Sequence, residues 1–164
     1  MLYIFGEDHF DPSNIERIHS KIKQLKPDYI LHELLYSDTC ETKKDIQNRL
    51  NHCKVDGVCD PRLNKDIYQL GLELNAKLIG IDTDIDKSDS LKAQFEKRED
   101  HMVNMIDRYI DRGVIVVVVG DTHLRSHRTG ELGRPSPIFT RFKDKAKILR
   151  ANEINGNVPT SMKW

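Results

Sequence analysis

The stretch Val114-Ile-Val-Val-Val-Val119, followed at once by Gly120-Asp-Thr-His123, decides the fold class. An unbroken run of β-branched residues predicts a strand that is buried on both faces, as in the centre of a parallel sheet. The run ends abruptly in a glycine, a carboxylate and a histidine, residue types that turn the chain and carry chemistry. We therefore expect residues 114–119 to form a central strand that delivers His123 to a site at its exit.

The same ending occurs at the N-terminus. Leu2–Phe5 predicts a strand, and Gly6-Glu-Asp-His9 follows it, so two distant segments share the pattern Gly-x-x-His. Glycine or aspartate alone at the start of a loop would mean little, because these residues begin loops routinely. A histidine at the same offset from the glycine in both segments favours function over coincidence. We predict that His9 and His123 meet in one site.

The residues between these segments alternate strands and helices. Strands are expected at 28–32 and 77–81, and a capping box at Ser13 and Glu16 predicts the start of a helix that Pro27 ends. Further helices are expected at 42–53, at 63–74, and from Ser88 or Ser90 to Arg112. Strand–helix–strand order implies right-handed parallel crossovers. The fold class predicted is therefore α/β, with a mixed, largely parallel β-sheet flanked by helices and a C-terminal β-hairpin from segments 138–142 and 146–150.

Length and composition indicate one domain over residues 1–154, with a polar and mobile tail at 155–164. Residues 36–61 form a polar insertion over the sheet edge that could act as a lid. The formal net charge is zero, so the chain lacks the charge signature of proteins that bind nucleic acid or a membrane surface. No run approaches the length of a membrane span. Met1 leads directly into a predicted strand, so we expect no secretory signal. We therefore expect a cytoplasmic protein, and we leave open whether it forms a homo-oligomer.

The cysteines Cys40, Cys53 and Cys59 all lie in or beside this insertion. An odd number in a chain without a signal favours reduced thiols. A zinc knuckle that also used His52 is the less favoured interpretation, because no Cys-x-x-Cys pair is present.

Four predicted strands end in polar residues: Glu7, Asp8 and His9; His32 and Glu33; Asp82 and Asp84; Asp121 and His123. The carboxyl ends of parallel strands lie along one edge of a sheet, where ligands bind, so these side chains should converge. Two imidazoles and a carboxylate suffice for a divalent metal with open positions for water. His9, His123 and Glu33 are the predicted ligands of Mn, Co or Zn. Glu7 and Asp121 could complete the shell, orient an imidazole, or serve as general base.

Four residues, His32, Glu33, Arg98 and Glu99, each allow two interpretations. His32 and Glu33 should point to opposite faces of their strand, and we favour Glu33 as the site residue, with His32 in the core or supporting it. Arg98 falls within the apolar stripe of the long helix, so it either pairs with a buried strand-end acid or extends its guanidinium to water. Glu99 lies at the edge of that stripe and fits either a flank or the site.

The loop after His123 is basic. Arg125, His127, Arg128 and Arg134 could grip a phosphate or carboxylate, although a solvated basic loop is the preferred interpretation. The remaining histidines, His19, His52 and His101, have no comparable context and are interpreted as surface or packing residues.

At these residues the sequence resembles a small member of the TraB/PrgY/Tiki group, from a superfamily with erythromycin esterases and ChaN-like haem-binding lipoproteins. Gly6-Glu-Asp-His9, Glu33 and Gly120-Asp-Thr-His123 occupy the places of that group's motifs, and Arg98-Glu-Asp-His-Met102 resembles its Arg-(Asp/Glu)-x-x-Met element. The resemblance spans about residues 1–150. It implies a mixed α/β fold and, for Tiki, metal-dependent cleavage of peptide bonds, and it equally allows esterase chemistry with a histidine base and no metal. This chain departs from the pattern in its short length, its lack of membrane segments and its cysteine-bearing insertion.

Together these observations predict a hydrolase that acts on an amide, ester or small-molecule bond, with a small molecule or peptide as substrate. In the metal-dependent form Glu7 is the base for the attacking water and Arg98 steadies the carboxylates or an oxyanion. In the metal-free form His9 abstracts the proton and Glu33 orients it. The alternatives are a binding module that sequesters haem or a small anionic, nucleotide-like molecule, and an inactive scaffold acting through the insertion.

Overall fold

A single six-stranded sheet organises the computed structural model, which describes residues 1–35, 38–55, 64–84, 88–127 and 133–155. The strand order is β3-β4-β2-β5-β1-β6, and every pairing is parallel except that of β3 with β4. The largely parallel α/β fold expected from the sequence is confirmed. The strands are β1 (Leu2–Glu7), β2 (Tyr29–His32), β3 (Thr39–Cys40), β4 (Lys77–Gly80), β5 (Ile115–Gly120) and β6 (Ala146–Leu149).

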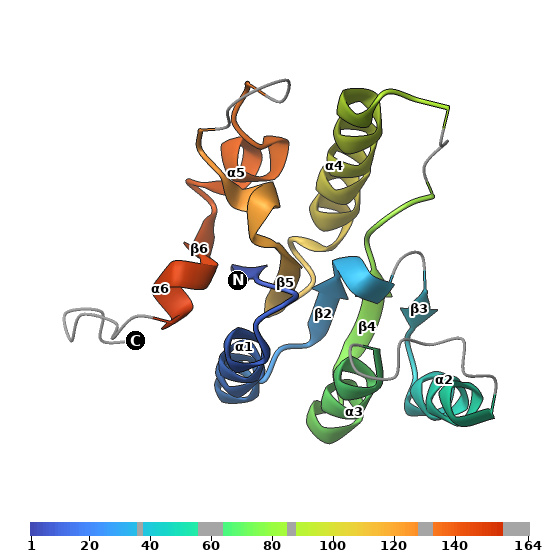
Figure 1. Cartoon of the computed structure of the whole chain (residues 1–164). Helices are drawn as coiled ribbons and strands as arrows, with labels where there is room; N and C mark the ends of the chain where they lie inside the picture. The colour runs from blue at the N-terminus through green and yellow to red at the C-terminus, as the bar shows by residue number, and fades with distance from the viewer. Residues whose placement is uncertain (36–37, 56–63, 85–87, 128–132, 156–164) are drawn as a thin grey trace.

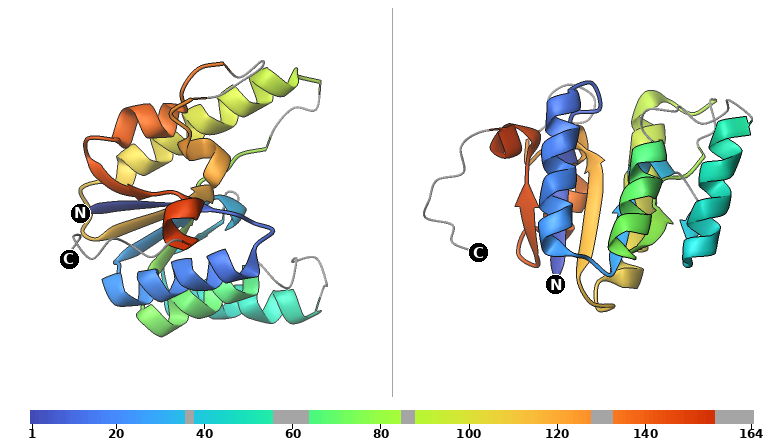
Figure 2. Two further views of the ribbon diagram at one scale, coloured as in Figure 1. Left: turned by 60° about the vertical axis from the view of Figure 1, so that its left-hand side comes forward. Right: turned by 90° about the horizontal axis from the view of Figure 1, so that it is seen from below.

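Helices cover both faces of this sheet (Figure 1). Figure 2 shows α1 (Pro12–Leu25), α2 (Lys43–Val55) and α3 (Asn64–Leu74) on one side, and α4 (Leu91–Tyr109) and α5 (Pro137–Phe142) on the other. The short α6 (Ala151–Asn155) follows β6 and contacts α1. The two helical layers leave the carboxyl ends of the parallel strands along one edge, which is where the candidate site lies.

The valine run forms the middle of the sheet because both of its faces are apolar. Val116 and Val118 pack into the core beneath α1 and α3, whereas Val117 and Val119 pack into the core beneath α4 and α5. All four are fully buried. Each such side chain contributes about 1.5–3 kcal/mol on burial, so a strand of this composition is most stable between two layers.

The position of β5 between β1 and β2 assembles the site. Glu7 of β1 lies opposite Gly120 of β5, and His32 of β2 lies opposite Val118. Strands that are far apart in sequence therefore end side by side. In open α/β sheets ligands bind at such a place, where successive crossovers lead to opposite sides of the sheet. Short 3₁₀ turns follow β2 at Glu33–Leu35 and β5 at Asp121–Leu124, and they fold the next side chains back over the edge.

The start of α1 differs from the prediction. The helix begins at Pro12, and its cap is Asp11, whose carboxylate accepts the Ser13 N–H at 2.9 Å, so the capping box at Ser13 and Glu16 is wrong. The cap is Asp11 and not Ser13 because Pro12 suits the first helical position. Proline has no N–H that would be left without a partner there, and its φ is already helical. Ser90 does cap α4, as one of the two predicted starts, and accepts the Ala93 N–H at 3.3 Å.

The predicted C-terminal β-hairpin is wrong. Residues 137–142 form α5, with Ser136 as its cap and Pro137 at its first position, and β6 pairs in parallel with β1 instead of antiparallel with its sequence neighbour. The apolar residues of this segment, Ile138, Phe139 and Phe142, have a spacing that fits a short helix. Ile138 and Phe142, four positions apart, are both fully buried against α4 and η2 (Asp121–Leu124).

The insertion adds to the sheet edge. Its described part, residues 38–55, forms the short antiparallel strand β3 and α2, which packs on α3. Residues 36–37 and 56–61, with Cys59, lie outside the described residues, and the lid role of the insertion stays a prediction. Cys40 is a buried free thiol. The tail was predicted at residues 155–164; Asn155 is the last residue of α6, and residues 156–164 lie outside the described residues. Among the described helices, none combines the length and apolar character needed to cross a bilayer.

Candidate active site

The two Gly-x-x-His histidines meet beside the main chain of Gly120. A Cβ placed on Gly120 would lie 3.0 Å from Nε2 of His9, 3.4 Å from Oε2 of Glu33 and 3.7 Å from Cδ2 of His123. The absence of a side chain there lets an acid and two imidazoles, each from a different segment, close over the end of β5. The predicted convergence of His9, Glu33 and His123 is confirmed.

Glu33 is the centre of the cluster. Its Oε1 lies 2.7 Å from Nη2 of Arg98 and 3.3 Å from Nε2 of His123, while its Oε2 accepts the Gly120 N–H at 2.7 Å. Nε2 of His9 stands 3.9 Å from that same Oε2. Burial alone would raise the pKa of Glu33, but the hydrogen bonds from His123 and Gly120 and the charge of Arg98 lower it to about 2. Glu33 is therefore ionised across the physiological range.

Each histidine is held from behind by a buried carboxylate. Nδ1 of His9 lies 2.8 Å from Glu7, and Nδ1 of His123 lies 2.8 Å from Glu99. The ring of Phe95 stacks on His123 with the centroids 5.1 Å apart. A carboxylate at Nδ1 fixes the orientation of the ring and leaves Nε2 to interact with other groups. In both histidines Nε2 is turned toward Glu33.

The two imidazoles differ in environment. The side chain of His9 is 26% exposed, and that of His123 only 4%. Burial opposes protonation of His123, but hydrogen bonds to Glu33 and Glu99 raise its pKa to about 9, so it carries a positive charge at neutral pH. The hydrogen bond to Glu7 likewise raises the pKa of His9, against the opposing effect of its partial burial.

Glu7 is buried between His9 and His32. It is 2% exposed, and its Oε2 lies 3.6 Å from Nε2 of His32. Nδ1 of His32 accepts the Leu34 N–H at 3.1 Å, so His32 carries its proton toward Glu7. Burial would raise the pKa of Glu7, but the hydrogen bonds of His32 and His9 hold it well below its usual range. His32 is thus a supporting histidine, as favoured from the sequence.

Arg98 joins two strand ends. Its Nε and Nη2 contact the two oxygens of Asp82 at 2.9 Å and 2.6 Å, in addition to the contact with Glu33. The pairing of Arg98 with strand-end acids is confirmed, and the extension of its guanidinium to bulk water is not observed. The bidentate pair with Asp82 fixes the guanidinium of Arg98, which in turn holds Oε1 of Glu33 through Nη2.

Asp121 does not join the site. It pairs with Arg150 and accepts the Ala151 N–H at 2.9 Å, on the side of β6 and α6. The predicted role of Asp121 beside His123 is therefore wrong. The carboxylate that holds His123 is that of Glu99 in α4. Glu99 is 1% exposed, and its place at the edge of an apolar helical stripe was the signal that identified it as a candidate.

The other candidates lie apart from the histidine cluster. Asp84 and Arg125 are exposed, His127 contacts Ser126 at 3.1 Å, and Arg134 pairs with Glu96 at 3.5 Å. Arg128 lies outside the described residues. The described part of this loop fits a solvated basic segment.

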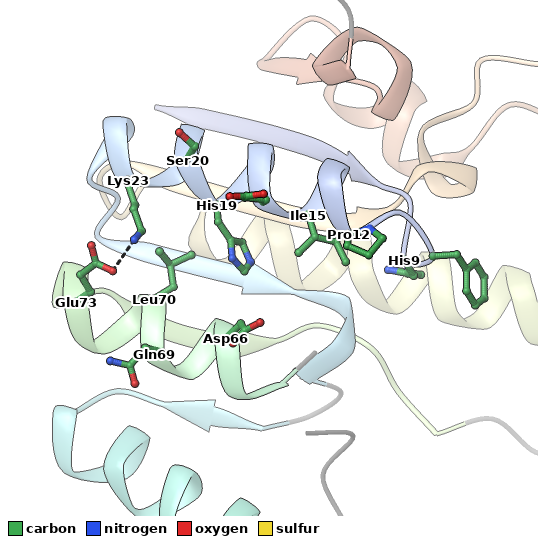
Figure 3. Close-up of a pocket in the computed structure, with 12 residues that line it drawn as sticks. His9, Pro12, Ile15, His19, Ser20, Lys23, Asp66, Gln69, Leu70 and Glu73 are labelled. Carbon is green, nitrogen blue, oxygen red and sulfur yellow. Dashed lines mark ion pairs between the residues drawn. The ribbon is translucent and has the colours of Figure 1, made fainter. Parts of the chain in front are cut away.

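A groove of about 880 Å³ between α1 and α3 reaches the cluster at His9 (Figure 3). His19 lines it together with His9, although the sequence indicated only a surface or packing role for His19. The sequence carried no signal for this groove, because it depends on how far apart two helices pack on the sheet.

The donor set at the cluster is only partly suited to a divalent ion. Two imidazoles with carboxylates at Nδ1 suit metal ligation. The third donor, Glu33, accepts hydrogen bonds at both oxygens, from Arg98 and from the Gly120 N–H, so a metal ion would have to share these oxygens with the protein. Among the described residues, no group of three or more His, Cys, Asp or Glu side chains is arranged to hold a metal ion. The predicted three-ligand site does not match this arrangement.

Known proteins inform the fold alone. Neither protein-family models nor curated proteins match the chain. Two similar solved structures are described as "Crystal structure of bacterial protein toxins" (18% identity, TM-score 0.57, covering 92% of this chain and 34% of that one) and "Bacterial protein toxins" (16%, 0.58, 90% and 34%). The chain therefore spans about a third of the length of these structures.

Proposed function

We propose that this protein is a hydrolase that cleaves an ester or amide bond of a small molecule or peptide. One observation carries the proposal: the partly exposed His9 has its Nδ1 on Glu7 and turns its Nε2 toward an ionised carboxylate 3.9 Å away. That separation is too long for a direct hydrogen bond and suits a water that contacts both atoms. A water in that position has a base on one side and an acceptor on the other.

In the reaction, Nε2 of His9 takes a proton from this water, and the oxygen attacks the carbonyl carbon. Glu7 stabilises the imidazolium that results, and Glu33 accepts the second O–H of the water and orients it. The proton on His9 then passes to the leaving oxygen or nitrogen as the bond to carbon breaks. General acid–base catalysis by a positioned imidazole contributes about 10²–10⁴-fold in rate.

The negative charge that develops on the carbonyl oxygen is stabilised by the two cations of the site. His123 is held protonated between Glu33 and Glu99, and Arg98 is fixed by Asp82. Cations that are already oriented stabilise an oxyanion without rearranging during the reaction. The resemblance of both Gly-x-x-His motifs, Glu33 and Arg98 to the TraB/PrgY/Tiki group supports the same class of reaction.

Hydrolysis of p-nitrophenyl acetate and of aminoacyl-coumarin amides tests the proposal. We expect His9→Ala to lower kcat by about 10²–10⁴-fold on the accepted substrate. His127→Ala, which removes an exposed histidine outside the site, should leave kcat unchanged. Equal rates for wild type and His9→Ala on every substrate would contradict the proposal.

The metal-dependent form predicted from the sequence has its own measurement. Protein purified without chelator is analysed for Mn, Co and Zn, and its activity is measured before and after EDTA. Activity through the protein's own residues predicts no loss with EDTA. Stoichiometric metal, lost together with activity, would instead assign His9, Glu33 and His123 as ligands after rearrangement of Glu33.

A further inference from the structure

The groove between α1 and α3 has the size and position of a substrate channel. Its volume of about 880 Å³ lies within the range of small-molecule sites. One end is formed by His9, the proposed base, and the other by Lys23 and Glu73, which pair at 2.8 Å (Figure 3). A molecule bound at His9 therefore has room to extend between the two helices.

The lining of the groove combines apolar and acidic groups. Phe10, which is 95% exposed, lies at the His9 end, and Ile15 and Leu70 line the groove from α1 and α3. An exposed aromatic ring beside a proposed catalytic residue offers a surface on which an apolar segment can pack. The groove thus favours a chain-like ligand with an apolar stem over a compact anion.

The charged side chains of the groove indicate which charge the ligand carries at its end. Apart from the imidazoles of His9 and His19, the charged lining of the groove consists of the carboxylates of Glu16, Asp66 and Glu73 and the ammonium of Lys23. Because Lys23 is paired with Glu73, an excess of negative charge is left at Glu16 and Asp66. His19 sits among these residues, and its burial lowers its pKa, so it adds no compensating positive charge at neutral pH.

We propose that this groove binds the part of the substrate beyond the cleaved bond and selects a substrate that carries a primary ammonium or guanidinium on an apolar stem. Glu16 and Asp66 are the specificity-determining residues, and His19 contributes a neutral hydrogen-bonding ring. This assignment rests on the proposed hydrolase function, because only that function makes the bound molecule a substrate. The binding itself does not require turnover.

The test uses a probe that needs no reaction. N-dansyl-1,5-diaminopentane has an aromatic group, an apolar stem and a primary ammonium, and the matching dansyl alcohol differs only by a hydroxyl at the end. Binding is followed by fluorescence and located by amide chemical-shift changes. We expect the amine to bind with shifts confined to α1, α3 and the segment of His9, and about fivefold more tightly than the alcohol, the size of one or two exposed ion pairs.

The variants separate charge from fold. Glu16→Gln with Asp66→Asn should weaken the amine about fivefold and leave the alcohol unchanged. Asp144→Asn, an exposed acid between α5 and β6, is the matched control and should change neither. Equal binding of amine and alcohol, or shifts mapping to α4 or α5, would overturn the assignment.

The two proposals can fail separately. If His9→Ala retains probe binding and no ester or amide is hydrolysed by wild type, the groove stands and the hydrolase function fails. If hydrolysis depends on His9 but cationic and neutral substrates of the same shape are cleaved equally well, the hydrolase function stands and the charge selection fails.

Discussion

The two Gly-x-x-His segments have the same pattern and opposite surroundings. In Gly6-Glu-Asp-His9 the acid beside the glycine, Glu7, holds the histidine of its own motif. In Gly120-Asp-Thr-His123 the acid beside the glycine turns away to Arg150, and the histidine is held by Glu99 from α4. The orienting carboxylate of the first motif, Glu7, belongs to the motif itself. The orienting carboxylate of the second motif, Glu99, belongs to α4.

This difference assigns different tasks to the two imidazoles. His9 is partly exposed and opens to the groove, which suits a group that exchanges protons with water. His123 is buried between two carboxylates beneath Phe95, which suits a fixed positive charge. Sequence symmetry therefore does not imply functional symmetry, and the comparison can be tested at matched positions.

The largest effect is expected at the acids beside the two glycines. Glu7→Gln should lower kcat by about 10²–10⁴-fold, because the amide cannot stabilise protonated His9. Asp121→Asn should change kcat less than about threefold, because its partner is Arg150. Steady-state kinetics on the same substrate decide between them. Equal losses in both variants would restore the symmetrical interpretation.

The histidines themselves should differ in their contribution to stability. His123→Ala leaves Glu33 and Glu99 buried without their shared cation, and we expect a loss of about 3–5 kcal/mol in the free energy of unfolding. His9→Ala should cost about 1 kcal/mol, because Glu7 keeps its contact with His32. Urea unfolding measures both. A larger loss for His9→Ala than for His123→Ala contradicts this assignment.

The stability of the wild type should depend on pH from both sides. Glu33 has its pKa lowered from 4.5 to about 2, so its contribution is complete above pH 4.5 and is lost as the pH falls toward 2. His123 has its pKa raised from 6.5 to about 9, so its contribution is complete below pH 6.5 and is lost as the pH rises through 9. Urea unfolding should show a plateau from pH 4.5 to 6.5, and a flat profile to pH 9 would remove the charge assigned to His123.

The smallest effect is expected at the two glycines. In Gly6→Ala the new Cβ would lie 2.6 Å from Oδ1 and 3.3 Å from Cα of Asp121, so the packing of β1 against the Asp121–Leu124 turn must shift, at about 1–3 kcal/mol of stability. In Gly120→Ala the nearest atom is Nε2 of the partly exposed His9, at 3.0 Å, which can move. We expect Gly120→Ala to lose mainly activity and Gly6→Ala mainly stability, as thermal unfolding and kcat will show.

Local patterns account for the parts of the site that were predicted. The valine run and its abrupt end place His123 at a strand exit, and the repeated Gly-x-x-His places His9 at another. Parallel strands then bring both exits to one edge, with Glu33 between them. The amphipathic stripe of α4 made Arg98 a residue in need of a buried acid, and Asp82 and Glu33 are such acids.

The wrong predictions, of the C-terminal hairpin and of the role of Asp121, have a different origin. Short segments such as 137–142 are ambiguous between helix and strand, because two buried residues four positions apart fit either pattern once neighbours are unknown. The direction in which Asp121 turns depends on Arg150, almost thirty residues later, and no local rule connects them.

By itself the sequence determined the α/β class, the central strand, and the identity of the three groups that meet beside Gly120, because burial and periodicity act on residues that are neighbours along the chain. Only the tertiary structure decided which acid holds which histidine, which imidazole is open to solvent, and where the groove beside His9 runs. These depend on the spacing and order of elements across the sheet, which are set by packing between segments that no local pattern connects.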